Sequence, residues 1–350
     1  MRLRAFLLLV SLPLAAQQSE LSPRAAAAPE ASKSFISLDV VVTDKAGKPV
    51  SGLEQQDFNV IDNKQPRKIA SFRAVDPSTA PPTEVVILLD ALNAPFADVA
   101  IQRQELEAFL AKNASTLPGP TTIVMMGDLG VALGAASARD AKDLVAAMNA
   151  GRSGKLVAAE DIGAYGVEGA QQVSLYELDR LADFEAAKPG RKLVIWISPG
   201  WPLLAGDDPD QGLNSKEQKA LFGTIVSLSD KLRRGRVSIY DIDPAGLADA
   251  DRFGTSDYKQ FEKGVKSAGQ TQVGSLGLQI LSDQTGGRVL NSSNDIAGEL
   301  EKCLADAKVY YTITFDAPKG DGPNELHTLD VRICKSGLTA RTRMMYYAQP

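Results

Sequence analysis

Short runs of consecutive apolar residues alternate with longer amphipathic stretches over residues 84–307. Apolar runs of this length are typical of parallel strands buried on both faces, and the stretches between them have the periodicity of helices that cover such a sheet. We therefore predict an α/β domain over residues 84–307, with a Rossmann-like, doubly wound and mostly parallel sheet and helices on both faces. The expected strands are Val85–Leu89, Thr122–Met126, Leu193–Ile197, Val237–Ile242 and Arg288–Leu290. The expected helices are Asp98–Lys112, Ala138–Met148, Val173–Ala187, Lys216–Arg234, Tyr258–Gly264, Val273–Thr285 and Asp295–Ala307.

Both flanks of this domain have the alternating pattern of half-buried strands. The N-terminal flank covers residues 35–75, and a linker with three prolines, Asp76–Thr83, joins it to the α/β domain. The C-terminal flank covers residues 308–350. We expect the two flanks to pack as a small β-sandwich, with the α/β domain inserted between them. The expected flanking strands are Phe35–Thr43, Phe58–Ile61, Lys68–Phe72, Val309–Phe315, Leu326–Ile333 and Leu338–Tyr347.

The N-terminus has the pattern of a secretory signal peptide. Arg2 and Arg4 precede an apolar run, Ala5–Leu14, and the small residues Ala15 and Ala16 follow it. A run of about ten residues is too short to cross a bilayer, which needs roughly 20. We predict that residues 1–16 are removed and that the chain is exported, to the periplasm or outside the cell, with no membrane span afterwards. Residues 17–34 are rich in Ala, Pro and Ser and are expected to form a disordered tether.

Composition narrows the class of partner. The chain has 350 residues, a net charge of −5, and lysines and arginines that are scattered rather than clustered. This argues against nucleic acid as a partner. The only cysteines are Cys303 and Cys334. In an exported protein they can form one disulfide, which would join the last helix of the α/β domain to a C-terminal strand, whereas the alternative is two separate thiols.

Residues that directly follow the apolar strands are the first candidates for a site, because open α/β sheets bind ligands at the carboxyl ends of their strands. Here they include Asp90 to Asn93, Ser198 to Trp201, and Asp241 with Asp243. A dinucleotide site is not supported, since no glycine-rich turn follows the first strand. No cofactor is expected.

Three segments carry a resemblance to the von Willebrand factor A domain family, and to its acidobacterial branch in particular. They are DVVVTDKAGKPVSGLEQQDFNVIDN, VVILLDALNAPFADVAIQRQELEAFL and LVIWISPGWPLL. The resemblance covers about residues 35–347. It implies a parallel sheet with one antiparallel edge strand and, commonly, a metal-ion-dependent adhesion site built from an Asp-x-Ser-x-Ser motif, a downstream threonine and a strand-end aspartate.

That implied metal site is degenerate in this chain. Asp90 matches the first aspartate, but Leu92 and Ala94 stand where the motif has serines, and neither has an oxygen for a hard cation. Ser198-Pro199-Gly200 stands where the family often has Thr-Asp-Gly. We therefore expect no metal, because Asp90 alone would hold at most a weak residual site.

Two interpretations of the strand-end residues remain open. Asp90 and Asn93 fit a structural role, in which the carboxylate accepts backbone N–H bonds from the following loop. Trp201, between Gly200 and Pro202, fits either an exposed anchor for a partner or a lid folded onto the core. We assign Asp90, Asn93, Ser198 and Trp201 as the candidate partner-binding residues.

Enzymatic functions are poorly supported by the residue inventory. His327 is the only histidine and falls in an expected C-terminal strand, so neither a Ser-His-Asp triad nor a zinc site is predicted. We expect a non-enzymatic binding or adhesion protein for a protein or cell-envelope ligand, of open oligomeric state. The alternatives are an envelope assembly component and, less favoured, a hydrolase that uses Asp90 with Asp241 or Asp243.

Overall fold

The computed structural model describes residues 34–75, 82–113, 117–127, 130–133, 137–150, 162–201, 213–244, 258–259 and 261–350. The expected signal peptide and tether lie outside these residues. Within the described part of the chain, none of the helices is both long and apolar enough to span a bilayer.

A six-stranded sheet forms the centre of the α/β domain, with the order β10-β9-β8-β5-β6-β7. Five strands run parallel, and the edge strand β7 pairs antiparallel with β6. When the six strands are numbered 1–6 along the chain and read from β7, the order is 3-2-1-4-5-6. The direction of winding therefore reverses between the neighbouring strands β5 and β8. The strands are β5 Glu84–Asp90, β6 Thr121–Gly127, β7 Gly130–Val131, β8 Lys192–Ile197, β9 Val237–Ile242 and β10 Val289–Leu290.

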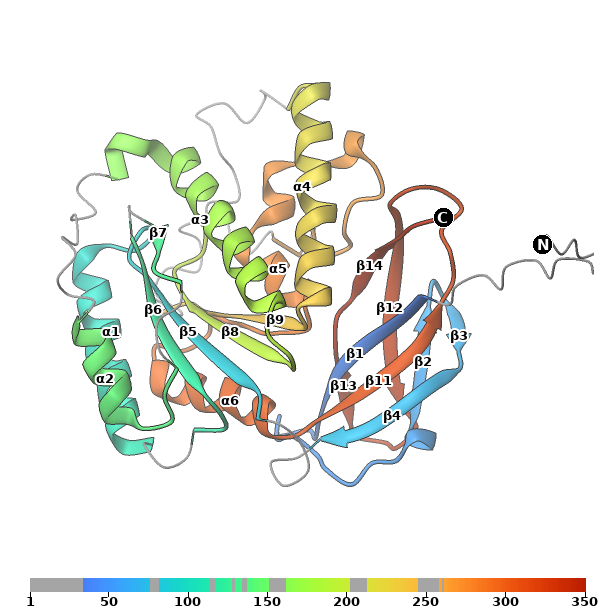
Figure 1. Cartoon of the computed structure of the whole chain (residues 1–350), viewed down its shortest axis with the longest axis horizontal. Helices are drawn as coiled ribbons and strands as arrows, with labels where there is room; N and C mark the ends of the chain where they lie inside the picture. The colour runs from blue at the N-terminus through green and yellow to red at the C-terminus, as the bar shows by residue number, and fades with distance from the viewer. Residues whose placement is uncertain are drawn as a thin grey trace, which may run out of the picture. The chain divides into compact units, whose positions relative to one another are not determined.

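Helices cover both faces of this sheet, as Figure 1 shows. On one face, α3, α4 and α5 pack on a buried cluster that includes Leu178, Leu228 and Leu281. On the other, α1, α2 and α6 pack on a cluster that includes Leu106, Leu144 and Leu300. The predicted mostly parallel sheet with helices on both faces is confirmed. The helices are α1 Phe96–Asn113, α2 Ala141–Ala150, α3 Ile162–Ala186, α4 Ser215–Arg234, α5 Leu278–Gln284 and α6 Ile296–Lys308.

Two four-stranded antiparallel sheets combine strands from both flanks of the chain. One has the order β13-β1-β11-β4 and the other β14-β12-β2-β3. Their inward side chains, such as Leu38, Val60, Ile313 and Val331, share one hydrophobic core. The strands are β1 Ser34–Thr43, β2 Phe58–Asp62, β3 Gln65–Arg67, β4 Ile69–Val75, β11 Tyr310–Ala317, β12 Glu325–Ile333, β13 Thr339–Arg341 and β14 Met345–Ala348.

Several expected elements are divided in the structure. The helix expected over Val273–Thr285 is a 3-10 turn, Val273–Leu276, followed by α5, because Gly277 is extended and serves as the N-cap of α5. The strand expected over Leu338–Tyr347 is split between the two sheets as β13 and β14. The Asp62–Gln65 turn is part of a tight hairpin, since Asn63 and Lys64 have positive φ and Asp62 pairs with Gln65. The described residues of Tyr258–Gly264 contain no α-helix.

The expected disulfide between Cys303 and Cys334 is wrong for this structure, in which both are free thiols. Cys303 lies on the buried face of α6, in the core between α6 and the parallel sheet. Cys334 directly follows β12 and is exposed, with its backbone N–H donating to the carbonyl of Asp57. The two thiols are therefore separated, because Cys303 faces the parallel sheet inside the α/β domain whereas Cys334 is exposed on the sandwich.

Candidate functional site

The point where the sheet reverses its winding lies between the carboxyl ends of β5 and β8. Asp90 is the last residue of β5, and Ser198 follows the last residue of β8. The two strands are neighbours in register, with Leu89 opposite Ile197. The topology thus brings together Asp90, Asn93, Ser198 and Trp201, the four residues assigned from the sequence, at the edge where open α/β sheets hold their ligands.

Asp90 accepts five hydrogen bonds. Its Oδ1 accepts from the backbone N–H groups of Leu92 and Asn93, at 3.0 and 2.9 Å. Its Oδ2 accepts from the Asn93 side-chain amide at 2.8 Å, from the Trp196 indole at 3.0 Å and from the Ser198 hydroxyl at 2.9 Å. The carboxyl group is fully buried. Its lone pairs are therefore committed to the loop after β5 and to strand β8.

The amide of Asn93 extends this network to a helix. Its Nδ2 also donates to Ser174 Oγ at 2.9 Å, and the Ser174 hydroxyl donates to the carbonyl of Ala170 one turn earlier in α3. Asn93 thereby links the loop after β5 to the helix that covers one face of the sheet. The sequence analysis did not include Ser174 or Trp196, although the position of Trp196 on β8, two residues before Ser198, was a usable signal.

Two opposing effects set the protonation of Asp90. Burial raises the pKa of this carboxyl above its ordinary value, and the hydrogen bonds from Trp196, Asn93 and Ser198 act in the opposite direction. Hydrogen bonds to the charged form stabilise it, so they offset part of the cost of desolvation. Among the described residues no arginine or lysine bonds to Asp90, so hydrogen bonds supply the partial compensation of this buried carboxyl group.

The loop after β8 is fixed by Ser198. The Ser198 hydroxyl donates to Asp90 and accepts the backbone N–H of Gly200 at 3.1 Å. Gly200 has φ +94°, and a Cβ atom there would lie 2.3 Å from Nε2 of Gln279. A side chain at position 200 would meet both backbone strain and a steric clash.

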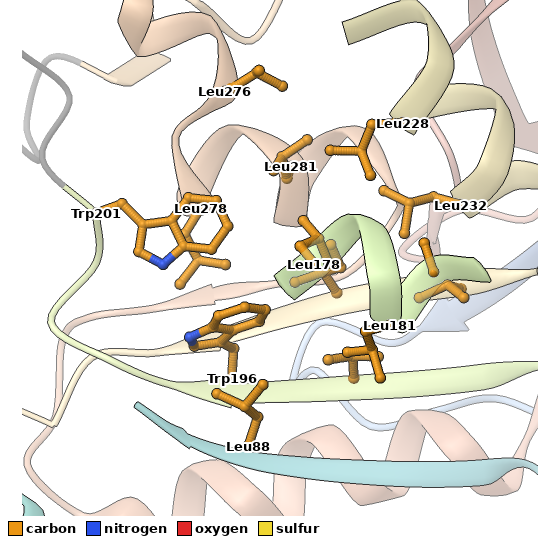
Figure 2. Close-up of a cluster of buried hydrophobic side chains, with 14 of the residues drawn as sticks. Leu88, Leu178, Leu181, Trp196, Trp201, Leu228, Leu232, Leu276, Leu278 and Leu281 are labelled. Atoms are coloured by element: carbon orange, nitrogen blue, oxygen red, sulfur yellow. The ribbon is translucent and has the colours of Figure 1, made fainter. Parts of the chain in front are cut away.

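Trp201 is a lid on the core rather than an exposed anchor. Its side chain is fully buried and meets Trp196 edge to face, with ring centroids 5.1 Å apart. Figure 2 shows the Trp201 ring beside Leu278, with Trp196 beneath it on β8. Asp90, Asn93 and Ser198 are buried as well. Of the two interpretations left open for Trp201, the structure has the lid, because edge-to-face packing on Trp196 and burial against Leu278 stabilise the inward orientation.

Asp241, near the end of β9, has a different environment. It is fully buried, and among the described residues neither of its carboxylate oxygens has a hydrogen-bond partner. Burial, followed by the charges of Asp243, Asp283 and Asp90, raises its pKa well above the ordinary value. The sequence predicted that Asp241 lies near the carboxyl end of its strand, as it does. It did not predict that the side chain is buried away from hydrogen-bond donors, because that depends on how the surrounding elements pack.

Phe96 is an exposed aromatic side chain at this edge. It is the first residue of α1, three positions after Asn93, and 53% of its surface is accessible. Phe96 is not among the residues predicted from the sequence. The available signal was an apolar residue directly after the strand-end loop.

The side chains around Asp90 do not fit a metal. Leu92 and Ala94 are buried and apolar. In the part of the chain that the structure describes, no three histidine, cysteine or acidic side chains come close enough together to hold an ion. Hard cations such as Mg²⁺ require several oxygen ligands with free lone pairs, and all those of Asp90 face hydrogen-bond donors.

His327 lies in the sandwich, on β12. Its Nδ1 is 2.8 Å from Asp62 Oδ1, and the Tyr346 hydroxyl donates to Asp62 Oδ2 at 3.0 Å. This buried group joins β2, β12 and β14, which agrees with the predicted position of His327 in a C-terminal strand.

No protein-family model matches the sequence, and no curated protein matches it significantly. Among solved structures, the pilus adhesin SpaC from Lactobacillus rhamnosus GG in its open conformation is 10% identical, with a TM-score of 0.42 over 86% of this chain and 48% of that chain. A second SpaC structure has a TM-score of 0.39, 10% identity and coverage of 86% and 49%. The manganese-loaded TRAP protein of Plasmodium vivax is 9% identical, with a TM-score of 0.33 over 78% of this chain and 96% of that chain. The chain thus spans about half the length of SpaC. These likenesses are too distant to assign a function, which rests below on the residues of the site.

Proposed function

We propose that this chain is an exported binding protein related to the von Willebrand factor A domains, and that it recognises a protein or cell-envelope ligand at the carboxyl edge of its parallel sheet. In this proposal the edge carries a degenerate adhesion site that works without a bridging cation. Asp90, Asn93, Ser198 and Trp201 act indirectly, by holding the surface that touches the partner.

The observation that carries the proposal is the set of five hydrogen bonds on Asp90. A carboxylate that would bind a metal needs free lone pairs, whereas this one is saturated by donors from a loop, a strand and an asparagine side chain. Such a network rigidifies the loop after β5, and a rigid surface loses less conformational entropy on binding. The loop leads directly into the exposed Phe96.

Phe96 is the contact residue that this proposal favours. Aromatic side chains, phenylalanine included, are enriched in protein interfaces relative to the rest of the surface. The alternative, an envelope assembly role for the sandwich, has an observation of its own, since Phe35 on β1 is also 53% exposed. The two phenylalanines have equal exposure and stand on different parts of the fold, so each is a control for the other.

The deciding experiment compares Phe96→Ser with Phe35→Ser. The full chain, after any natural processing, is immobilised, and its binding to envelope fractions of the organism that encodes it is measured by interferometry with and without EDTA. We expect Phe96→Ser to weaken binding about tenfold or more, as for a residue that dominates an interface. Phe35→Ser and EDTA are expected to leave it unchanged.

The opposite pattern would favour the assembly role. Loss of binding in Phe35→Ser, with Phe96→Ser equal to the wild type, would move the interface to the sandwich. Loss of binding in EDTA would contradict the metal-free site. Thermal unfolding of both variants is the control for folding, and neither exposed substitution should shift Tm by more than a degree or two.

A further inference from the structure

A small polar hollow lies at the amino end of the parallel sheet, opposite the Asp90 edge. It is formed where the first residues of β9 and the end of α4 meet strand β1 of the sandwich. Three arginines line it, namely Arg233, Arg236 and Arg343. The protein has a net charge of −5, so a group of three guanidinium groups around one hollow is a local feature rather than a reflection of composition.

Two of these arginines are neutralised by carboxylates. Arg236 Nε donates to Asp39 Oδ2 at 3.0 Å, and its Nη2 donates to Asp39 Oδ1. Arg233 Nη2 lies 2.5 Å from Asp230 Oδ1. These pairs account for the charges of Arg233 and Arg236, which leaves Arg343 to be explained.

Arg343 is a buried guanidinium group with no direct ion-pair partner in the described residues. The residue is 8% exposed, and the hydrogen bond that its side chain makes there, 3.5 Å long, goes to the carbonyl of Val237. Burial, followed by the charge of Arg233, lowers its pKa to about 9, although the charges of Asp39 and Asp230 act in the opposite direction. These two carboxylates already pair with Arg236 and Arg233, so they offset only part of the charge of Arg343. A buried charge that is only partly compensated is unfavourable, and an added anion would lower that cost.

Two hydroxyl groups of the lining are further donors. Ser37 on β1 and Ser238 on β9 line the hollow, and no hydrogen bond of either hydroxyl is found within the described part of the chain. The Asp39 carboxylate also lines it, paired with Arg236. The two hydroxyls and Arg343 come from three different segments, so they can reach different oxygens of a tetrahedral anion, which has four oxygens where a carboxylate has two.

The size of the hollow limits the ligand. Its cavity volume is about 20 Å³, far below the roughly 300–1,000 Å³ of pockets for drug-sized molecules. A nucleotide is therefore too large, and the ligand must be as small as a single ion.

The geometry points to a binding site for a small tetrahedral oxyanion, phosphate or sulfate, held by the Arg343 guanidinium and the hydroxyls of Ser37 and Ser238. The bound anion is a direct ion-pair partner for the Arg343 guanidinium group. It also connects β1 of the sandwich with β9 of the α/β domain, since its ligands come from both. This site is independent of the proposed recognition edge.

The test is thermal unfolding of the full chain in a buffer free of phosphate and sulfate. Phosphate, sulfate or acetate is then added, with chloride keeping the ionic strength constant. We expect phosphate or sulfate to raise Tm by about 1–2 °C at roughly five times Kd, and acetate to have no comparable effect. Isothermal titration with inorganic phosphate gives the stoichiometry, which we expect to be one.

Variants decide whether Arg343 is responsible. Arg343→Met should abolish the response to phosphate, while Arg332→Met, which removes a 71% exposed side chain on β12, should keep it. If Arg343→Met does not fold, Ser238→Ala replaces it, with an expected several-fold weaker affinity for phosphate. An unresponsive wild type, an equal response to acetate, or an unchanged response in Arg343→Met or Ser238→Ala would each overturn the site.

Discussion

The Trp196 indole donates its N–H to Asp90 Oδ2 across 3.0 Å, from β8 to the carboxyl end of the neighbouring strand β5. The indole N–H is the only polar group of the Trp196 side chain, and Asp90 is its hydrogen-bond acceptor. The same indole packs against Trp201, so the hydrogen bond positions the lid of the core as well as the loop after β5.

Replacement of Asp90 should destabilise the protein strongly. Asp90→Ala leaves the Trp196 indole, the Asn93 amide and the Ser198 hydroxyl without their shared acceptor in a buried site. The loss of a buried, multiply bonded charged group costs about 3–5 kcal/mol, measurable by urea unfolding. Asp330→Ala, at an exposed position on β12, is the control and should change the free energy of unfolding by less than about 0.5 kcal/mol. Equal stability of the two variants would contradict the structural role of Asp90.

Asp283 should make the stability of the protein depend on pH. Burial at the end of α5, followed by the neighbouring Glu262, raises its pKa to about 7. The folded chain therefore retains a proton that the unfolded chain has lost, and this contribution to stability falls as pH rises from about 4 to about 7. Asp283→Asn should remove this part of the slope in urea titrations at several pH values. Asp330→Asn should follow the wild type, and a slope unchanged in Asp283→Asn would contradict the assignment.

The two cysteines should differ sharply in reactivity. Cys334 is exposed, whereas Cys303 is buried on α6, where burial and the nearby Asp306 raise the pKa of its thiol well above the ordinary value. A thiol reagent at pH 8 should modify one cysteine in the folded protein and two in denaturant without reductant. Cys334→Ser should remove the fast reaction. Failure to find two free thiols in denatured, unreduced protein would show that a disulfide forms in solution.

Divalent cations should not bind tightly at the Asp90 edge. Calorimetric titration with Mg²⁺, Mn²⁺ or Ca²⁺ is expected to show no affinity tighter than millimolar, because Asp90 has no free lone pair and Leu92 and Ala94 supply no oxygen. Detection of micromolar binding that disappears in Asp90→Asn would contradict this expectation.

The sequence was sufficient for the central sheet, because a strand buried on both faces leaves a clear apolar run. Val237–Ile242 was predicted with its true bounds, and β5 and β8 within one residue at each end. Elements whose signal is weaker were missed or merged. The edge strand Gly130–Val131 has two residues and no periodicity, and the extended Gly277 divides a stretch that otherwise has a helical pattern.

The sequence placed the strand-end residues of the candidate site at one edge of the sheet but did not reveal that they are buried. Asp90 and Ser198 follow apolar strands, so topology alone brings them to one edge. Whether Trp201 points outward or inward depends on Leu278, which lies 77 positions along the chain, and periodicity within a strand contains no such information. The arginine cluster at the amino end of the parallel sheet was not predicted either. Arg233 and Arg343 are far apart in sequence and come together only in the folded chain.

The pairing of the two ends of the chain also constrains how the protein folds. Asp39 on β1 accepts a hydrogen bond from Thr312 on β11, 273 positions later. Contacts of such long sequence separation form slowly, so the sandwich core can close only after nearly the whole polypeptide has been synthesised. Until then β1 has a free hydrogen-bonding edge. A chain that stays open until its last strands arrive gives chaperones a long period in which to bind it, and that delay also increases the risk of aggregation.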